Sequence, residues 1–171
     1  MSIVQVIEER VRERRLFLLE PRAAGTSPKR VLLIEERLWD FLNEPGPDDD
    51  WEERKGFLLA DLEVFAAGEP IGPKYLFLLY RASEGVWEIR SVRPQPSIRI
   101  LGRFAQRDVF VATNFALREE LGEWQSREWR NVKITARTKW VNLFHTYQPL
   151  ISTNVSDVVS GAINGKYFKD H

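Results

Sequence analysis

The chain has 171 residues, of which 43% are hydrophobic and 29% are charged, and this composition suits one globular domain. Cysteine is absent and only two histidines occur, which excludes disulfide frameworks, thiol nucleophiles and metal centres rich in cysteine or histidine. The net charge is zero, no apolar run reaches the ~20 residues of a membrane span, and residues 1–15 do not resemble a signal peptide, so we expect a soluble, cytoplasmic protein without a metal or other cofactor.

The sequence allows two structures, a helix or a strand, for the first predicted element. Apolar residues within 4–11 have a helix-like spacing, whereas residues 2–7 alone also suit a strand. Residues 16–19 and 31–34 are apolar runs on either side of a turn-rich stretch, residues 21–28. This arrangement predicts a β-hairpin.

Two helices are predicted next. From Glu35 the apolar residues take a helical spacing that ends at Asn43, and an acidic loop rich in proline follows. Asp50 is a suitable N-cap for a second, longer helix, and Gly68 is a suitable stop residue.

The middle of the chain has the pattern of a β-meander. Four runs show apolar or alternating residues, and short turns or proline-rich loops separate them. We therefore expect four antiparallel strands in sequential order, because neighbouring strands in the chain usually pair. The runs are residues 75–80, 86–92, 98–104 and 109–113.

The remaining residues predict helices. Residues 115–121 suit a short helix, and apolar residues at helical spacing within 129–144 suit a long one. A last short helix is expected over residues 155–163 with Gly165 at its end, and Tyr167-Phe168 is expected to dock the tail. The whole pattern predicts an α+β fold, in which helices and an added C-terminal helical layer pack on a twisted antiparallel sheet in a single domain, residues 1–171.

The neutral total charge hides an uneven distribution. Residues 1–73 contain 10 Lys and Arg against 16 Asp and Glu, whereas residues 74–145 contain 13 against 7. Ten of those 13 cations are arginines, which bind phosphate through two parallel hydrogen bonds. The middle segment therefore favours an anionic partner, although a solvated sheet face balanced by the acidic helices is an equally good interpretation.

Four arginines are expected to lie close together in the meander. Arg90 lies on one predicted strand, Arg99 and Arg103 share a face of the next, and Arg118 opens the following helix. Like charges repel unless an anion or an acid neutralises them. Glu88 supplies the acid in a purely structural interpretation, and a phosphodiester supplies the anion in a functional one.

Four short segments of the chain carry a resemblance to a known family, and they are Gly68–Leu76, Gly85–Arg90, Ser97–Leu101 and Val109–Phe115. Together they resemble the RelE/ParE toxin superfamily, and most closely its HigB-like branch, which phages and other mobile elements often carry. The resemblance covers about residues 50–120, implies a RelE-like sheet preceded by two helices, and leaves residues 123–171 as a C-terminal helical extension.

The resemblance implies a toxin of a type II toxin–antitoxin system. Such a toxin is a metal-independent RNA endonuclease, commonly ribosome-dependent, and a cognate antitoxin protein neutralises it. By position, Arg90 and Arg99 match the family's strand arginines, and Arg118 matches the second of two lysines. The resemblance therefore implies catalytic roles for these three arginines, and contacts to RNA or phosphate from Arg103, Arg93, Arg107 and Lys74.

The source of the proton transfer differs from the family pattern. Arginine does not deprotonate, and residues 75–132 contain neither lysine nor histidine. His145 or Tyr147 can supply an acid or base only if the C-terminal helix folds back over the sheet. Two alternatives therefore stay open: a non-enzymatic binding protein of a mobile element with the same fold, and a ParE-like inhibitor of a topoisomerase. The oligomeric state is not predicted.

Overall fold

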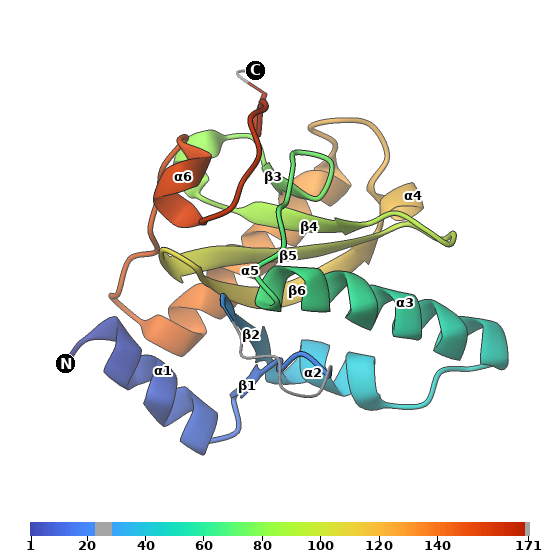
Figure 1. The fold of residues 1–171 in the computed structure, drawn as a ribbon, viewed down its shortest axis with the longest axis horizontal. Coiled ribbons are helices and arrows are strands. Elements are labelled where there is room, and N and C mark those ends of the chain that lie inside the picture. Colours follow the sequence, from blue (N-terminus) through green and yellow to red (C-terminus); the bar gives the residue numbers. More distant parts are fainter. Residues whose placement is uncertain (23–28, 170–171) are drawn as a thin grey trace.

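The structure, a computed structural model, describes residues 1–22 and 29–169. One six-stranded sheet with the strand order β1-β2-β6-β5-β4-β3 forms its centre (Figure 1). The elements are α1 (Ile3–Arg12), β1 (Leu16–Leu18), β2 (Val31–Glu35), α2 (Glu36–Asn43), α3 (Asp49–Ala66), β3 (Leu76–Leu78), the 3-10 helix η1 (Ala82–Glu84), β4 (Trp87–Ser91), β5 (Ile98–Gln106), β6 (Val109–Leu117), α4 (Arg118–Leu121), α5 (Arg127–Phe144) and α6 (Val155–Val158).

The sheet contains the predicted meander and one pairing that the prediction lacked. Strands β3, β4, β5 and β6 pair antiparallel in sequential order, and β1 and β2 form the predicted hairpin. Residues 23–28 of the predicted turn lie outside the described residues. However, β2 pairs parallel with β6, so the sheet is mixed and the expectation of an antiparallel sheet was wrong for this pair. The long connection from β2 to β6, which runs through α2, α3 and the first three strands of the meander, permits the parallel arrangement, whereas a tight turn does not.

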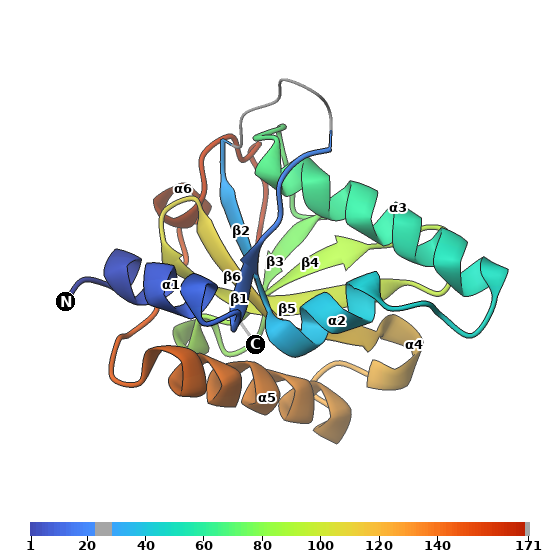
Figure 2. The same cartoon turned by 90° about the horizontal axis from the view of Figure 1, so that it is seen from below.

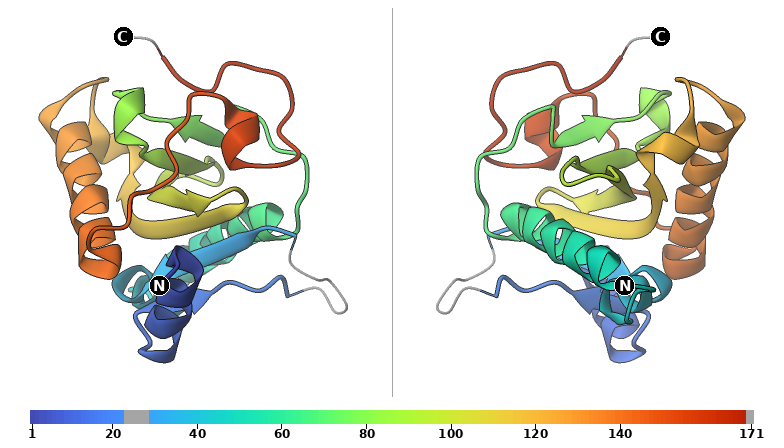
Figure 3. Two further views of the ribbon diagram at one scale, coloured as in Figure 1. Left: turned by 90° about the vertical axis from the view of Figure 1, so that its left-hand side faces the viewer. Right: turned by 90° about the vertical axis from the view of Figure 1, so that its right-hand side faces the viewer.

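Helices cover both faces of the sheet. Figures 2 and 3 show α3 on one face and α5 on the other. Alternation along β5 divides its side chains between the two: Ile98, Ile100 and Phe104 join the core beneath α3, whereas Leu101 joins the core beneath α5. Within the described ranges, no helix is long and apolar enough to cross a membrane.

The first element is a helix. The Ser2 hydroxyl accepts a hydrogen bond from the Gln5 backbone N–H, and the Gln5 side chain accepts one from the Ser2 backbone N–H. This reciprocal cap stabilises the first turn and decides between the helix and the strand. The cap of α3 is Asp48, two residues before the predicted Asp50.

The elements after β6 differ in extent from the prediction. Residues 115–117 continue β6 as strand, because Phe115 pairs with Ile100 and stacks on Phe41 with a centroid distance of 3.9 Å. The last helix, α6, is only one turn long, and the predicted stop at Gly165 was wrong. The chain beyond it pairs with Ile71 instead, and Tyr167 is buried in the core, which confirms the docked tail.

Candidate functional site

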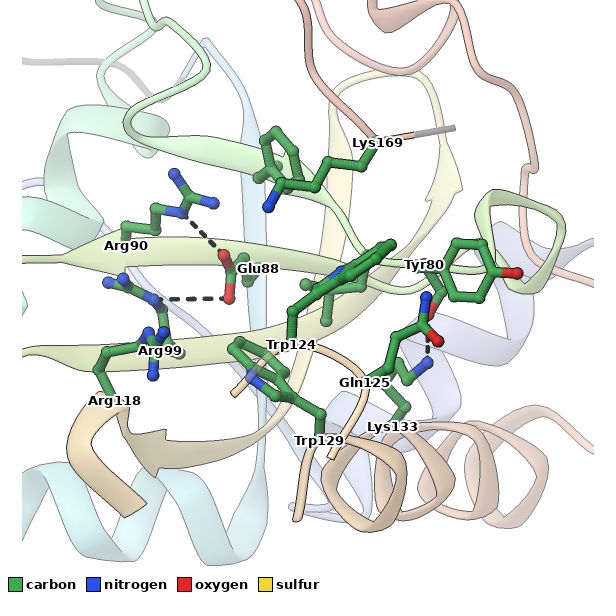
Figure 4. Close-up of a pocket in the computed structure, with 12 residues that line it drawn as sticks. Tyr80, Glu88, Arg90, Arg99, Arg118, Trp124, Gln125, Trp129, Lys133 and Lys169 are labelled. Carbon is green, nitrogen blue, oxygen red and sulfur yellow. Dashed lines mark hydrogen bonds and ion pairs between the residues drawn. The ribbon is translucent and has the colours of Figure 1, made fainter. Parts of the chain in front are cut away.

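A hollow of about 130 Å³ opens on the α5 face of the sheet, where β3, β4 and β5 meet the loop between α4 and α5 (Figure 4). Its wall is rich in cations and aromatic rings, and it contains one carboxylate among the described residues. The polar and charged residues that line it are Tyr80, Glu88, Arg90, Arg99, Arg118, Gln125, Lys133 and Lys169, and the apolar ones are Phe77, Leu79, Trp124 and Trp129.

Strand alternation directs the charged side chains into the hollow. In β4, Trp87 and Ile89 join the α3 core, so Glu88 and Arg90 point to the α5 face. Arg99 of β5 lies directly opposite Arg90 in the antiparallel pairing. Arg118 follows at once after β6, as the first residue of α4. The structure therefore brings together Arg90, Arg99 and Arg118, as the sequence predicts.

Glu88 neutralises two of these arginines. Its Oε1 atom lies 2.7 Å from Arg90 Nε and its Oε2 atom 3.6 Å from Arg99 Nε (Figure 4). The Glu88 side chain is 2% exposed, and the Arg99 side chain is 12% exposed. The structural interpretation of Glu88 is therefore correct for this pair, and Arg99 is a half-buried residue of the wall.

Burial leaves several polar atoms of the hollow incompletely satisfied. Arg99 Nε, Glu88 Oε2 and Trp129 Nε1 are buried without a hydrogen-bond partner among the described residues. Burial lowers the pKa of the Arg99 guanidinium, and the Glu88 carboxylate opposes that shift. A buried donor without a partner costs free energy, and a ligand oxygen that accepts its hydrogen bond removes that cost.

Arg118 and Lys169 keep their charge available to a ligand. Arg118 donates to the Gly122 carbonyl, and its guanidinium lies 5.8 Å from the Trp129 ring centroid. The Lys169 Nζ atom lies 5.1 Å from the Trp124 ring centroid. No ion pair within the described part of the chain involves either cation. Together they give the hollow a positive charge that Glu88 does not cancel.

Trp124 forms an exposed aromatic surface between the two ends of the hollow. Its side chain is 43% exposed, and it meets the Tyr80 ring edge-on with a centroid distance of 5.4 Å. In Figure 4 the arginines lie on one side of the indole, and Tyr80, Gln125 and Lys133 lie on the other. An exposed indole beside cations is a surface on which a planar ring can stack.

Two lysines that were not predicted from the sequence belong to the site. Lys133 projects from α5, donates to the Tyr80 carbonyl oxygen and lies 3.9 Å from Glu84. Its pKa is lowered, chiefly by burial. Lys169 comes from the C-terminal segment. The available signal for Lys133 was its place four residues after Trp129 on the inward stripe of α5, where a charge is unusual.

The predicted phosphate-binding residues do not all join the hollow. Arg103 projects from the same sheet face as Arg99, as predicted, but it is buried beside the hollow, where it donates to the Glu84 carbonyl over 2.5 Å and lies over Trp140. The other three are exposed and do not line the hollow. Arg93 and Arg107 lie in the connections at opposite ends of β5, and Lys74 precedes β3.

His145 and Tyr147 do not reach the hollow. Both follow the C-terminal end of α5, whereas Lys133 lies 12 residues, or about 18 Å of helix, before His145. The Tyr147 hydroxyl donates to the Met1 carbonyl oxygen instead. Although α5 packs on the sheet, its direction places these two groups at the wrong end for an acid or base in this site.

Comparison with known proteins identified no relative: no family model, no curated protein and no solved structure matches the chain.

Proposed function

We propose that the hollow binds the sugar–phosphate backbone of single-stranded RNA. The observation that carries this proposal is the position of Arg118 and Lys169, two cations without a carboxylate partner in the described structure, beside the exposed Trp124. Phosphate oxygens accept hydrogen bonds from the cations, and a base stacks on the indole. Proteins that bind single strands commonly combine these two features.

RNA is favoured over other anions for two reasons. A free phosphate or a small carboxylate has no planar ring to use the Trp124 surface. The strand segments also resemble those of RNA-cleaving toxins.

Binding is tested with a labelled single-stranded RNA of about 12 nucleotides and fluorescence anisotropy. Arg118→Gln is expected to weaken binding and to reduce the slope of log affinity against log salt by about 0.7, the value for one phosphate contact. Trp124→Ala is expected to cost about 1–3 kcal/mol of binding, which is typical of one stacked base. The matched control is Arg12→Gln, which removes an exposed cation of α1. Equal affinity in wild type, Arg118→Gln and Trp124→Ala contradicts the proposal.

A second candidate function is cleavage of the bound RNA, as in a RelE-like toxin that an antitoxin protein controls. The observation that favours it is Lys133, because residues 75–132 contain neither lysine nor histidine and the fold brings this lysine into the hollow. Its lowered pKa favours the neutral amine that a base requires. The 2′-hydroxyl would lose its proton to this amine and attack the adjacent phosphorus, while Arg99 and Arg118 bind the phosphoryl oxygens. The bond from phosphorus to the 5′-oxygen breaks, and that oxygen takes a proton from a water molecule, whose hydroxide takes the 2′-hydroxyl proton back from Lys133. The products are a 2′,3′-cyclic phosphate and a 5′-hydroxyl.

Cleavage is tested with end-labelled RNA, free and bound to ribosomes, and with an otherwise identical strand of 2′-deoxynucleotides. The RNA is expected to be cut and the deoxy strand to stay intact, because only the RNA carries the nucleophile. Lys133→Met is expected to abolish cutting, and expression of the wild type is expected to slow bacterial growth. RNA that is bound but never cut identifies a non-enzymatic binding protein instead.

A further inference from the structure

A second basic cleft continues the hollow along α5. Its volume is about 220 Å³, and it shares Tyr80, Gln125 and Lys133 with the hollow. Arg81, which precedes η1, and Arg130 of α5 are exposed on its wall. The two spaces therefore adjoin each other between the η1 end of the sheet and α5, and together they are called the groove.

The cleft gathers more positive charge than its acid balances. Arg81, Arg130, Lys133 and Arg137 all line it, whereas Glu84 is its only carboxylate among the described residues. Glu84 lies 3.9 Å from Lys133, so it is already engaged with one of these cations.

Two arginines at the cleft are incompletely satisfied. Arg103 donates to the carbonyl oxygen of Glu84, a residue of the cleft wall. The Nε atoms of Arg103 and of Arg137, which lines the cleft, are buried without a hydrogen-bond partner in the described structure. Burial, followed by the charge of Arg137, lowers the pKa of Arg103 to about 10. Arginines that are desolvated and mutually repelling in this way become more stable when an anion binds beside them.

We propose that the hollow and the cleft bind consecutive phosphates of one RNA strand, so that the ligand is an oligonucleotide and not a mononucleotide. This inference rests on the proposed function. The strand passes from the arginines of the hollow, across the Trp124 ring, to the cations of the cleft. Lys133 lies at the junction and Arg137 one helical turn, about 6 Å, further along α5.

The experiment compares ligand lengths in wild type and in a cleft variant. Arg81→Gln/Arg130→Gln removes two exposed cations of the cleft, and Arg127→Gln is the matched control, because it removes an exposed cation of α5 outside both spaces. The ligands are a labelled dinucleotide and a labelled RNA of about 12 nucleotides. Thermal melting confirms that each variant is folded.

The cleft variant is expected to bind the longer RNA about tenfold more weakly, with a salt slope reduced by about 1.4 for two lost contacts. Its affinity for the dinucleotide is expected to equal that of wild type.

If Arg118→Gln weakens binding of the longer RNA and the cleft variant does not, the cleft inference is wrong and the proposed function stands. If wild type binds neither RNA, both are wrong. If a poly-glutamate peptide displaces the RNA at equal charge concentration, the groove serves an acidic protein, which also contradicts the inference.

Discussion

Lys133 shows how one buried cation links packing to binding. It occupies an inward position of α5 between Trp129 and Ala136, and its Nζ atom reaches the Tyr80 carbonyl oxygen. Burial lowers its pKa most, and the positive charges of Arg137 and Arg130 lower it further. The carboxylate of Glu84 opposes these effects. Lys133 therefore loses its charge at a lower pH than a surface lysine does.

This property predicts a pH dependence of RNA binding. Phosphate binds the charged form of the lysine. The affinity for RNA is therefore expected to fall as the pH rises, and the fall is expected to begin below pH 10.5, the usual pKa of lysine. Lys133→Arg keeps its charge there and is expected to show a flatter profile. Anisotropy titrations up to about pH 9, below the Arg103 pKa of about 10, measure the effect. Parallel profiles in the two proteins contradict it.

Glu88 is expected to have opposite effects on stability and on binding. Glu88→Gln removes the carboxylate that neutralises Arg90 and Arg99, so two buried or half-buried guanidinium groups remain without an acid. We expect a loss of about 2–3 kcal/mol of unfolding free energy, less than for a fully buried pair because Arg90 is partly exposed. RNA affinity is expected to increase, because no carboxylate then competes with phosphate. Denaturant melts and anisotropy test the two effects separately, and weaker binding by a folded variant contradicts this role.

At the scale of elements, α5 covers the second face of the sheet. Trp140 of α5 and Trp124 of the loop before it have different roles. Trp140 is 1% exposed, packs on Phe144 and donates its Nε1–H to the Tyr147 carbonyl oxygen. Trp124, in the loop before α5, is exposed. The first is a core residue, and the second is a surface on which a ligand can rest.

Trp140→Ala is therefore expected to lower the free energy of unfolding by about 3–5 kcal/mol, because it leaves a large cavity and removes a buried hydrogen bond. Trp124→Ala serves as the matched control and is expected to change it by about 0.5 kcal/mol or less. Urea denaturation of both variants checks this. Similar midpoints for the two variants show that α5 contributes little to the fold.

Much of the element order is predictable because the patterns involved are local. Alternation and short turns define the meander, and the stripe of Trp129, Ala136 and Trp140 defines α5. The parallel pairing of β2 with β6 is not predictable in this way, because nothing in either apolar run specifies its neighbour. The continuation of β6 through Phe115 depends on a ring contact with Phe41, a residue of a distant helix.

The site is predictable to the same extent. Arg90 and Arg99 follow from the alternation of adjacent strands, and the neighbouring Glu88 was recognised as their candidate acid. Lys133 and Lys169 were missed because their approach to the hollow depends on how α5 and the C-terminal segment pack. Arg107 lies at the turn beyond β5, outside the hollow, so the contact that the resemblance implied for it has no support from its position.

At the scale of the molecule, many arginines hold segments together rather than face a ligand. Arg30 is 1% exposed and donates to the carbonyl oxygens of Phe65, Glu69 and Ser160, so it joins the end of α3 to the chain after α6. Arg54 donates in the same way to the carbonyls of Ser91 and Pro96. The arginine content alone therefore overstates the basic surface, and the groove beside α5 is identified by its geometry.

The pairing of β2 with β6 has a kinetic consequence. The meander from β3 to β6 closes only short loops, whereas joining Val31 to Val109 closes a long one and costs more chain entropy. We expect the meander to form early and β2 to dock after the rate-limiting step. Leu32→Ala, in the buried centre of β2, is then expected to accelerate unfolding and to leave the refolding rate nearly unchanged in stopped-flow measurements. A refolding rate that falls in proportion to the lost stability would instead place β2 in the folding nucleus.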